Sequence, residues 1–176
     1  MKITWVTRSF LDYRVPVYKA LDELCGHNLT IIYYGDVVPE RVQNKLKAFL
    51  EERAIALSGE WRIGGRKADN ATMANKGFRI PIQPGLLKAI RRTRPDLMIS
   101  DGFFQWTYAP LLMRMLHRKI KHVMCYERTK HTERNAGRIR TLYRKLALNW
   151  IDAVDCNGSL TGEYIESLGF PRERLT

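Results

Sequence analysis

The chain has 176 residues, of which 45% are hydrophobic, and it carries a formal net charge of +12. This length fits one domain with a buried core, and the charge favours an anionic partner such as nucleic acid, acidic lipid or a phosphorylated substrate. A signal peptide and a run of the ~20 apolar residues that span a bilayer are both excluded, so we expect a cytoplasmic protein, with attachment to the inner membrane face as an alternative.

The first half of the chain alternates short apolar runs with amphipathic segments. Strands are predicted at residues 3–6 and 29–34, each followed by a helix with one apolar face. The first face carries Val17, Tyr18, Leu21, Leu24 and Cys25, and the second carries Val42, Leu46, Phe49 and Leu50. Residues 58–84 have no clear periodicity, and we expect one short strand and a long loop there.

The second half repeats this alternation more clearly. Further strands are predicted at residues 96–100, 122–126 and 152–156. The accompanying helices are marked by Leu86, Leu87 and Ile90; by Tyr108, Leu111, Leu112 and Met115; by Ile139, Leu142, Tyr143, Leu146 and Trp150; and by Leu160, Tyr164, Ile165 and Leu168. The alternation over residues 1–176 predicts a single α/β domain, with a mostly parallel, Rossmann-like sheet and helices on both faces.

Polar residues follow the predicted strands at their carboxyl ends. They are Arg8 and Ser9, Gly35, Asp101 and Gly102, Glu127 and Arg128, and Asn157 to Ser159. Ligands of parallel α/β sheets bind beyond these ends, which meet at one edge of the sheet. The sequence therefore predicts a polar cleft at that edge.

The familiar cofactor motifs do not occur at this edge. The segment after the first strand, "TRSFLDYRVP", lacks the G-x-G-x-x-G pattern, and Gly59 and Gly64 have phosphate-loop spacing but are followed by Gly65 in place of a lysine. The four histidines have no ligand-like spacing to cysteines or carboxylates. We therefore predict neither a cofactor nor a metal.

Glu127 and His131 are the candidates for catalysis. Both follow the strand at 122–126, and their cationic neighbours favour an ionised Glu127 and a neutral His131. Such a pair could bind or deprotonate a hydroxyl nucleophile. In the structural alternative, Glu127 forms an ion pair with an arginine and His131 lies in a solvated loop. Asp101 is either a site residue or a helix cap.

The helix predicted after residue 137 has one apolar and one basic face. We expect its apolar stripe, from Ile139 to Trp150, to be core. Its cations point elsewhere and either are solvated or face anionic lipid: Arg138, Arg140, Arg144 and Lys145. Nucleic acid is disfavoured as a partner, because the aromatic residues lie on predicted core faces and not on an exposed stacking surface.

Several stretches of the chain also carry a family resemblance. "KITWVTRSFLDYRVPVYKALDEL" resembles the opening of family 4 glycosyltransferases of the GT-B type, and "RPDLMISDG" resembles their fourth strand. "CYERTKHTERNAGRIRTLYRKL" and "IDAVDCNGSLTGEYIESLGFPRERL" resemble the stretch that closes their first domain. The similarity spans the chain apart from residues 58–84. One branch of this family has paired glycines after the first strand, and this sequence does not match that branch.

The resemblance implies one half of a two-domain enzyme. Such enzymes hold the acceptor in a first domain and bind the nucleotide sugar in a second one, which carries an E-x7-E signature. This chain would be the first domain, inactive alone, and the donor domain would lie outside it. Glu52 and Glu60 have the E-x7-E spacing, which we interpret as coincidence. The implied reaction moves a sugar to an acceptor hydroxyl in polysaccharide or glycolipid synthesis, with retention and without a metal.

The resemblance also implies roles for residues at the strand ends. Glu127 and His131 would be catalytic, and contacts to acceptor or donor phosphates would come from Arg8, Tyr13, Arg14, Asp101, Arg128 and Asn157. With a lipid-linked acceptor, the basic helix would hold the domain at the membrane. Two other classes remain open: a non-catalytic α/β module that binds a phosphorylated ligand, and one subunit of a split glycosyltransferase.

Overall fold

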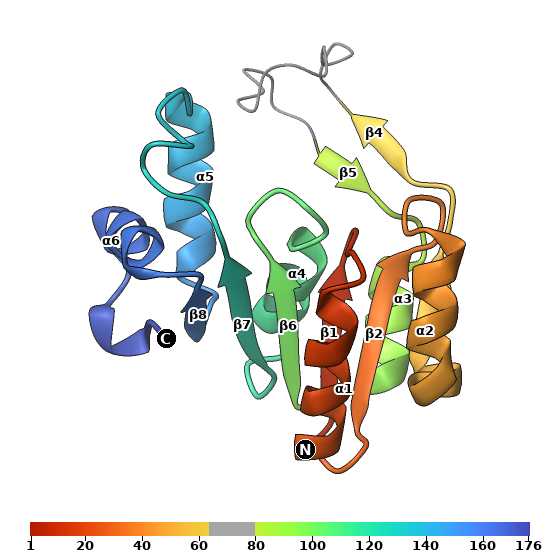
Figure 1. Cartoon of the computed structure of the whole chain (residues 1–176). Coiled ribbons are helices and arrows are strands. Elements are labelled where there is room, and N and C mark those ends of the chain that lie inside the picture. The colour runs from red at the N-terminus through yellow and green to blue at the C-terminus, as the bar shows by residue number, and fades with distance from the viewer. Residues whose placement is uncertain (64–79) are drawn as a thin grey trace.

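A computed structural model describes residues 1–63 and 80–176 of the chain (Figure 1). Its strands are β1 (Ile3–Thr7), β2 (Leu29–Tyr34), β3 (Ala54–Leu57), β4 (Trp61–Ile63), β5 (Ile80–Ile82), β6 (Leu97–Asp101), β7 (Lys121–Tyr126) and β8 (Ala153–Cys156). Its α-helices are α1 (Arg14–Leu24), α2 (Glu40–Leu50), α3 (Leu86–Thr93), α4 (Tyr108–Leu116), α5 (Arg138–Leu148) and α6 (Ser159–Ser167). Two 3-10 turns, η1 (Glu51–Arg53) and η2 (Arg172–Arg174), complete the described elements.

The central sheet has the strand order β3-β2-β1-β6-β7-β8, and every neighbouring pair is parallel. Trp5 of β1 lies beside Ile31 of β2 and Ile99 of β6, so the three strands end side by side. The chain proceeds outward from β1 in one direction and from β6 in the other. The boundary between β1 and β6 is therefore the switch point of the sheet, and the predicted Rossmann-like α/β fold is confirmed.

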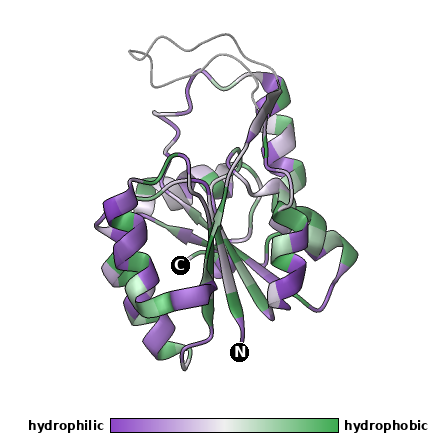
Figure 2. Ribbon diagram, turned by 90° about the vertical axis from the view of Figure 1, so that its right-hand side faces the viewer, coloured by the Kyte–Doolittle hydropathy of each residue, from purple (hydrophilic) through white to green (hydrophobic). Residues whose placement is uncertain are grey.

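Helices cover both faces of the sheet, which Figure 2 shows edge-on. The layer of α1 and α2 covers one face, and α3 and α4 cover the other, where α5 and α6 continue over β7 and β8. The three cores contain Trp5, Tyr18, Ile31 and Leu46; Val6, Ile32, Ile90 and Met113; and Met124, Leu148, Val154 and Ile165. Burial of both faces explains why the central strands are mostly apolar and do not alternate between apolar and polar residues.

One edge of the sheet differs from the sequence prediction. No pattern predicts β3, because its four residues follow α2 and η1 directly, without a turn signal. Within residues 58–84, the structure has an antiparallel ribbon of β4 and β5 where one strand was expected. The predicted loop falls largely on residues 64–79, which lie outside the described residues.

The apolar core face predicted for α5 is wrong at three of its five positions, whereas Tyr143 and Trp150 pack against the core as predicted. Ile139, Leu142 and Leu146 are 75%, 57% and 57% exposed, and the buried residues of this helix are Arg144, Ala147 and Leu148. Helical periodicity predicts the buried face of a helix from its apolar residues. The buried face of α5 instead carries Arg144, Ala147 and Leu148, and the carboxylate of Glu133 neutralises the charge of Arg144.

Arg144 is accordingly not a membrane-facing residue, since it is only 1% exposed. Its guanidinium donates to the Glu133 carboxylate and, at 2.6 Å, to the Tyr164 hydroxyl, and it lies over the ring of Phe104. Glu133 is also buried, and its other oxygen accepts a hydrogen bond from Arg128. These contacts hold the loop before α5 against α5 and α6.

Breaking this pair is expected to be costly. Glu133→Gln leaves the Arg144 charge buried without a counter-charge, and we expect it to lower the free energy of unfolding by about 3 kcal/mol or more. The double variant Glu133→Gln/Arg144→Met should regain a large part of that loss, because no charge is left buried. Urea denaturation measures both, with the exposed Glu163→Gln as control. A Glu133→Gln loss below about 0.5 kcal/mol would contradict the importance of the pair.

His122 is a second buried polar group, and it lies within β7. It is fully buried, and its Nε2 is 2.8 Å from the Ser100 hydroxyl of β6. Burial lowers the pKa of His122 from 6.5 to about 4. Below pH 6.5 the unfolded chain therefore takes up a proton at this residue that the folded chain does not.

The lower pKa of His122 in the folded chain predicts that the free energy of unfolding falls at acidic pH. The contribution of His122 to stability is present above pH 6.5 and is lost as the pH falls towards about 4, by about 3 kcal/mol in total. His122→Asn should flatten the dependence of unfolding free energy on pH across this window, whereas His117→Asn, at an exposed position, should not. Urea denaturation from pH 7.5 to pH 4 makes the comparison, and identical slopes in all three proteins would overturn it.

Candidate functional site

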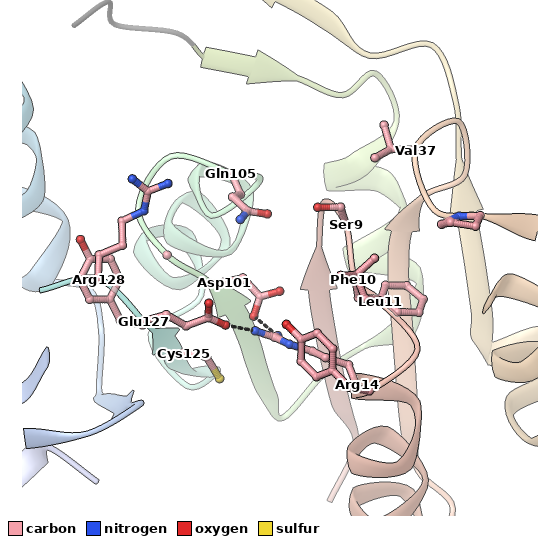
Figure 3. Close-up of a pocket in the computed structure, with 14 residues that line it drawn as sticks. Ser9, Phe10, Leu11, Arg14, Val37, Asp101, Gln105, Cys125, Glu127 and Arg128 are labelled. Atoms are coloured by element: carbon pink, nitrogen blue, oxygen red, sulfur yellow. Dashed lines mark hydrogen bonds and ion pairs between the residues drawn. The ribbon is translucent and has the colours of Figure 1, made fainter. Parts of the chain in front are cut away.

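A pocket of about 480 Å³ opens at the carboxyl ends of β1, β6 and β7, beside the switch point of the sheet (Figure 3). It is lined by Ser9, Phe10, Leu11, Tyr13, Arg14, Val37, Pro39, Asp101, Gly102, Gln105, Cys125, Tyr126, Glu127 and Arg128. Its position is where the strand ends predict a ligand site. Five of the eight residues predicted to act in catalysis or ligand contact line it: Tyr13, Arg14, Asp101, Glu127 and Arg128.

Arg14 joins the two carboxylates of the pocket. From the first turn of α1, its Nη1 donates to Asp101 Oδ1 at 2.8 Å and its Nη2 donates to Glu127 Oε1 at 2.5 Å. Figure 3 shows the guanidinium between the two acids, each of which follows or ends a different strand. The three residues are far apart in sequence, so the ion bridge depends on the parallel register of β6 and β7.

The two carboxylates differ in their access to solvent. The Asp101 side chain is 9% exposed and also accepts a hydrogen bond from Trp5 Nε1 at 3.3 Å. The Glu127 side chain is 55% exposed. Asp101 is therefore suited to hold Arg14 in place, and Glu127 keeps room for contact with a ligand.

The electrostatics of the pocket favour fixed charges over a thiol nucleophile. Burial alone would lower the pKa of Arg14, but the Asp101 carboxylate outweighs it and raises that pKa above its usual value. Burial raises the pKa of the Cys125 thiol, and Asp101 adds to the effect. Cys125 therefore stays protonated and is a poor nucleophile.

The turn after β6 brings Asp101 into position. Gly102 has a φ of +62°, in the left-handed region that favours glycine, which lets the chain reverse directly after the carboxylate. The Thr107 hydroxyl donates to the Gly102 carbonyl and closes this turn ahead of α4. Asp101 itself ends β6 and does not cap the helix, since α4 begins at Tyr108 with Thr107 at the cap position.

Arg8 belongs to a neighbouring network and does not line the pocket. It binds the Glu60 carboxylate through Nε at 2.6 Å and Nη2 at 2.8 Å, and Trp106 Nε1 donates to the same carboxylate at 2.9 Å. The Glu60 side chain is fully buried. Glu60 thus ties the segment before β4 to the loops that follow β1 and β6.

His131 lies apart from Glu127. It lines a second pocket of about 600 Å³ beside α6, together with Thr129, Lys130, Arg134, Leu160, Glu163, Tyr164 and Ser167. Its Nε2 is 2.8 Å from Arg134 Nη1. Asn157, after β8, is exposed and is not among the described residues that line the first pocket. The structure thus separates the two residues that the sequence paired as catalytic candidates.

Sequence reasoning missed most of the neutral pocket wall. Phe10, Leu11, Val37 and Gln105 come from loops after β1, β2 and β6. Their sequence positions directly after strands are a signal, but apolar loop residues are not distinguishable from core residues by type. Only the fold shows that they surround a cavity.

Two absences hold for the part of the chain that the structure describes. Residues 1–63 and 80–176 contain no group of three or more His, Cys, Asp or Glu side chains that could hold a metal ion. The helices within the same ranges are too short or too polar to cross a bilayer. The three cysteines are free thiols.

Comparisons of sequence give no match, either to a model of a known protein family or to a curated protein. Comparison with solved structures does find similar proteins. The chain is similar to UDP-GlcNAc 2-epimerase from Methanocaldococcus jannaschii, at 15% identity and a TM-score of 0.58, over 100% of this chain and 45% of that one. The UDP-GlcNAc 2-epimerase of Neisseria meningitidis, solved with bound UDP-GlcNAc, matches at 13% identity and a TM-score of 0.56, over 99% and 45%.

Anabaena Alr3699/HepE, solved in complex with UDP and glucose, is also similar, at 12% identity and a TM-score of 0.54, over 100% of this chain and 43% of that one. At such low identities the likeness shows the fold alone, which is a Rossmann-like α/β fold. The chain spans less than half the length of each of these proteins.

The unequal burial of the two carboxylates predicts unequal effects on stability. Asp101→Asn removes a buried counter-charge of Arg14, and we expect a loss of about 2 to 4 kcal/mol in the free energy of unfolding. Glu127→Gln removes a half-exposed partner and should cost less than about 1 kcal/mol. Urea denaturation of both variants gives the comparison, with Glu23→Gln on the exposed side of α1 as control. A larger loss for Glu127→Gln than for Asp101→Asn would contradict the assigned roles.

Proposed function

We propose that the chain is the N-terminal, acceptor-binding domain of a glycosyltransferase similar to family 4, which moves a sugar from a nucleotide-sugar donor to an acceptor hydroxyl. The observation that carries the proposal is the pocket in which Arg14 holds Asp101 and Glu127 at the switch point of the sheet. The similarity in fold to enzymes of UDP-GlcNAc and to a protein solved with UDP and glucose supports a nucleotide-sugar substrate.

The proposed chemistry rests on Glu127. One of its oxygens is bound to Arg14, which orients the carboxylate, and the side chain remains 55% exposed. An acceptor hydroxyl in the pocket would donate a hydrogen bond to Glu127 and become more nucleophilic. Tyr13 and Arg128, exposed at the rim, are suited to contact the acceptor or a donor phosphate.

The whole enzyme goes beyond this chain. The proposal includes a C-terminal domain that binds the nucleotide sugar, a saccharide or lipid-linked acceptor, a cytoplasmic location, and transfer with retention and without a metal or cofactor. Synthesis of a polysaccharide or glycolipid is the proposed setting. The cytoplasmic location follows from the composition of the sequence, and the other parts follow from its resemblance to family 4 enzymes.

A second candidate function is epimerisation of a nucleotide sugar. It is favoured by the similarity to two UDP-GlcNAc 2-epimerases. The two candidates differ in their products, since an epimerase changes UDP-GlcNAc without an acceptor and a transferase releases the nucleotide only as the sugar is transferred. Incubation of the two-domain enzyme with nucleotide sugars, with and without acceptor, distinguishes them.

We expect this chain alone to turn over no nucleotide sugar. Transfer requires donor and acceptor to be held together, and the proposed donor site lies outside the chain. Release of nucleotide from a panel of nucleotide sugars, measured with and without acceptor saccharides, should stay at the uncatalysed background. Sugar transfer by the 176-residue chain itself would contradict the proposal that the donor site lies in a second domain.

Glu127→Gln tests the role of the carboxylate. In the two-domain enzyme we expect kcat to fall roughly 100-fold or more, because the amide cannot accept the proton of the acceptor hydroxyl. The melting temperature should change little, since Glu127 is half exposed. Glu23→Gln, remote from the pocket, is the matched control. Near-normal turnover by Glu127→Gln would remove this residue from the reaction.

A further inference from the structure

The outer face of α5 exposes three large apolar side chains. Ile139, Leu142 and Leu146 are 75%, 57% and 57% exposed. They are spaced by three and four residues, so they form one continuous stripe on the helix. Contiguous apolar side chains on the surface of a folded domain are typical of a binding surface, whereas single exposed apolar residues are common.

Cations border the stripe on the same side of the helix. Arg138 lies four residues before Leu142, Lys145 lies three residues after it, and both are exposed. Residues 138–150 contain no acidic side chain. We call the five residues Arg138, Ile139, Leu142, Lys145 and Leu146 the α5 outer face.

The geometry of the helix explains why the stripe points outward. Arg144 occupies the opposite side and is held inside by Glu133 and Tyr164. Rotating α5 to bury the stripe would withdraw Arg144 from its counter-charge. The orientation of the apolar face is therefore fixed by a buried ion pair, and the stripe is not available to the core of this domain.

The charge on the outer face selects among possible occupants. A symmetric dimer through this face would bring Arg138 and Lys145 of one copy close to those of the other, in a chain with a net charge of +12. An anionic lipid surface offers complementary charge together with an apolar layer beneath it. A helix with an apolar stripe bordered by basic residues is suited to lie in that interface.

We propose that the α5 outer face docks on an anionic membrane surface, with Ile139, Leu142 and Leu146 inserted among the acyl chains and Arg138 and Lys145 at the headgroups. No α5 residue lines the pocket at the switch point, so this inference is independent of the proposed sugar transfer. It also replaces the membrane contact predicted for Arg144: the apolar stripe, and not the buried arginine, provides the anchor.

Binding of the 176-residue chain to vesicles tests the proposal. We expect sedimentation with vesicles of phosphatidylcholine and phosphatidylglycerol to exceed that with phosphatidylcholine alone. Binding should weaken between about 0.1 M and about 1 M salt, as the screening length falls from about 10 Å to about 3 Å. The variant Arg138→Gln/Lys145→Gln should bind anionic vesicles about 30-fold more weakly at low salt.

The apolar variant distinguishes insertion from general attraction of a basic protein. Ile139→Ser/Leu142→Ser/Leu146→Ser keeps every charge, and we expect it to bind at least roughly tenfold more weakly. Leu24→Ser, at an 85% exposed position of α1, and Lys19→Gln, also on α1, are single-site controls away from α5 and should bind nearly as the unchanged chain does. Because all these positions are exposed, the melting temperatures should be unchanged.

Three results would overturn the proposal. The first is equal binding of the unchanged chain to neutral and anionic vesicles. The second is undiminished binding of the triple serine variant, which would leave only diffuse charge attraction. The third is a dimer of the unchanged chain in solution that becomes a monomer in the triple serine variant, which would assign the α5 outer face to a second copy of the chain.

Discussion

Parallel pairing across β1, β6 and β7 is the constraint on which the rest of the structure depends. It sets the carboxyl ends of strands that are distant in sequence side by side, and it places the switch point of the sheet between β1 and β6. The backbone after each end must then leave the sheet, which opens space above the strands. Arg14 spans this space by binding Asp101 after one strand and Glu127 after the next. The pocket is thus a consequence of register as much as of residue type.

Buried ion pairs attach the irregular segments to this frame. Glu60 fixes the segment before β4 through Arg8 and Trp106, and Glu133 fixes the loop before α5 through Arg144. Each pair joins two different segments of the chain. Such pairs contribute little net stability compared with apolar residues of the same shape, but losing one partner is costly because the other charge stays buried.

The buried ion pair between Arg144 and Glu133 also determines which side of α5 faces the solvent. Neutralising Arg144 inside the domain allows α5 to pack through the side that carries Arg144, Ala147 and Leu148. Its apolar side then faces outward with Arg138 and Lys145 beside it. The candidate pocket at the sheet edge and the proposed docking surface thus lie on elements that are adjacent in the chain, since β7 leads through one loop into α5.

The sequence by itself determined the fold class, the strands of the central sheet except β3, and the edge at which Arg14, Asp101 and Glu127 meet. It could do so because strand–helix alternation and residue order are local properties, and parallel strands always end at the same edge. Only the tertiary structure decided that Arg8 pairs with Glu60, that His131 lies in another pocket, and which face of α5 is buried. The pairing of Arg8 and the packing of α5 depend on ion pairs between residues of different segments, and the place of His131 depends on how its loop lies beside α6. A helical period of 3.6 residues shows which residues share a face of the helix, but it does not show which face is buried.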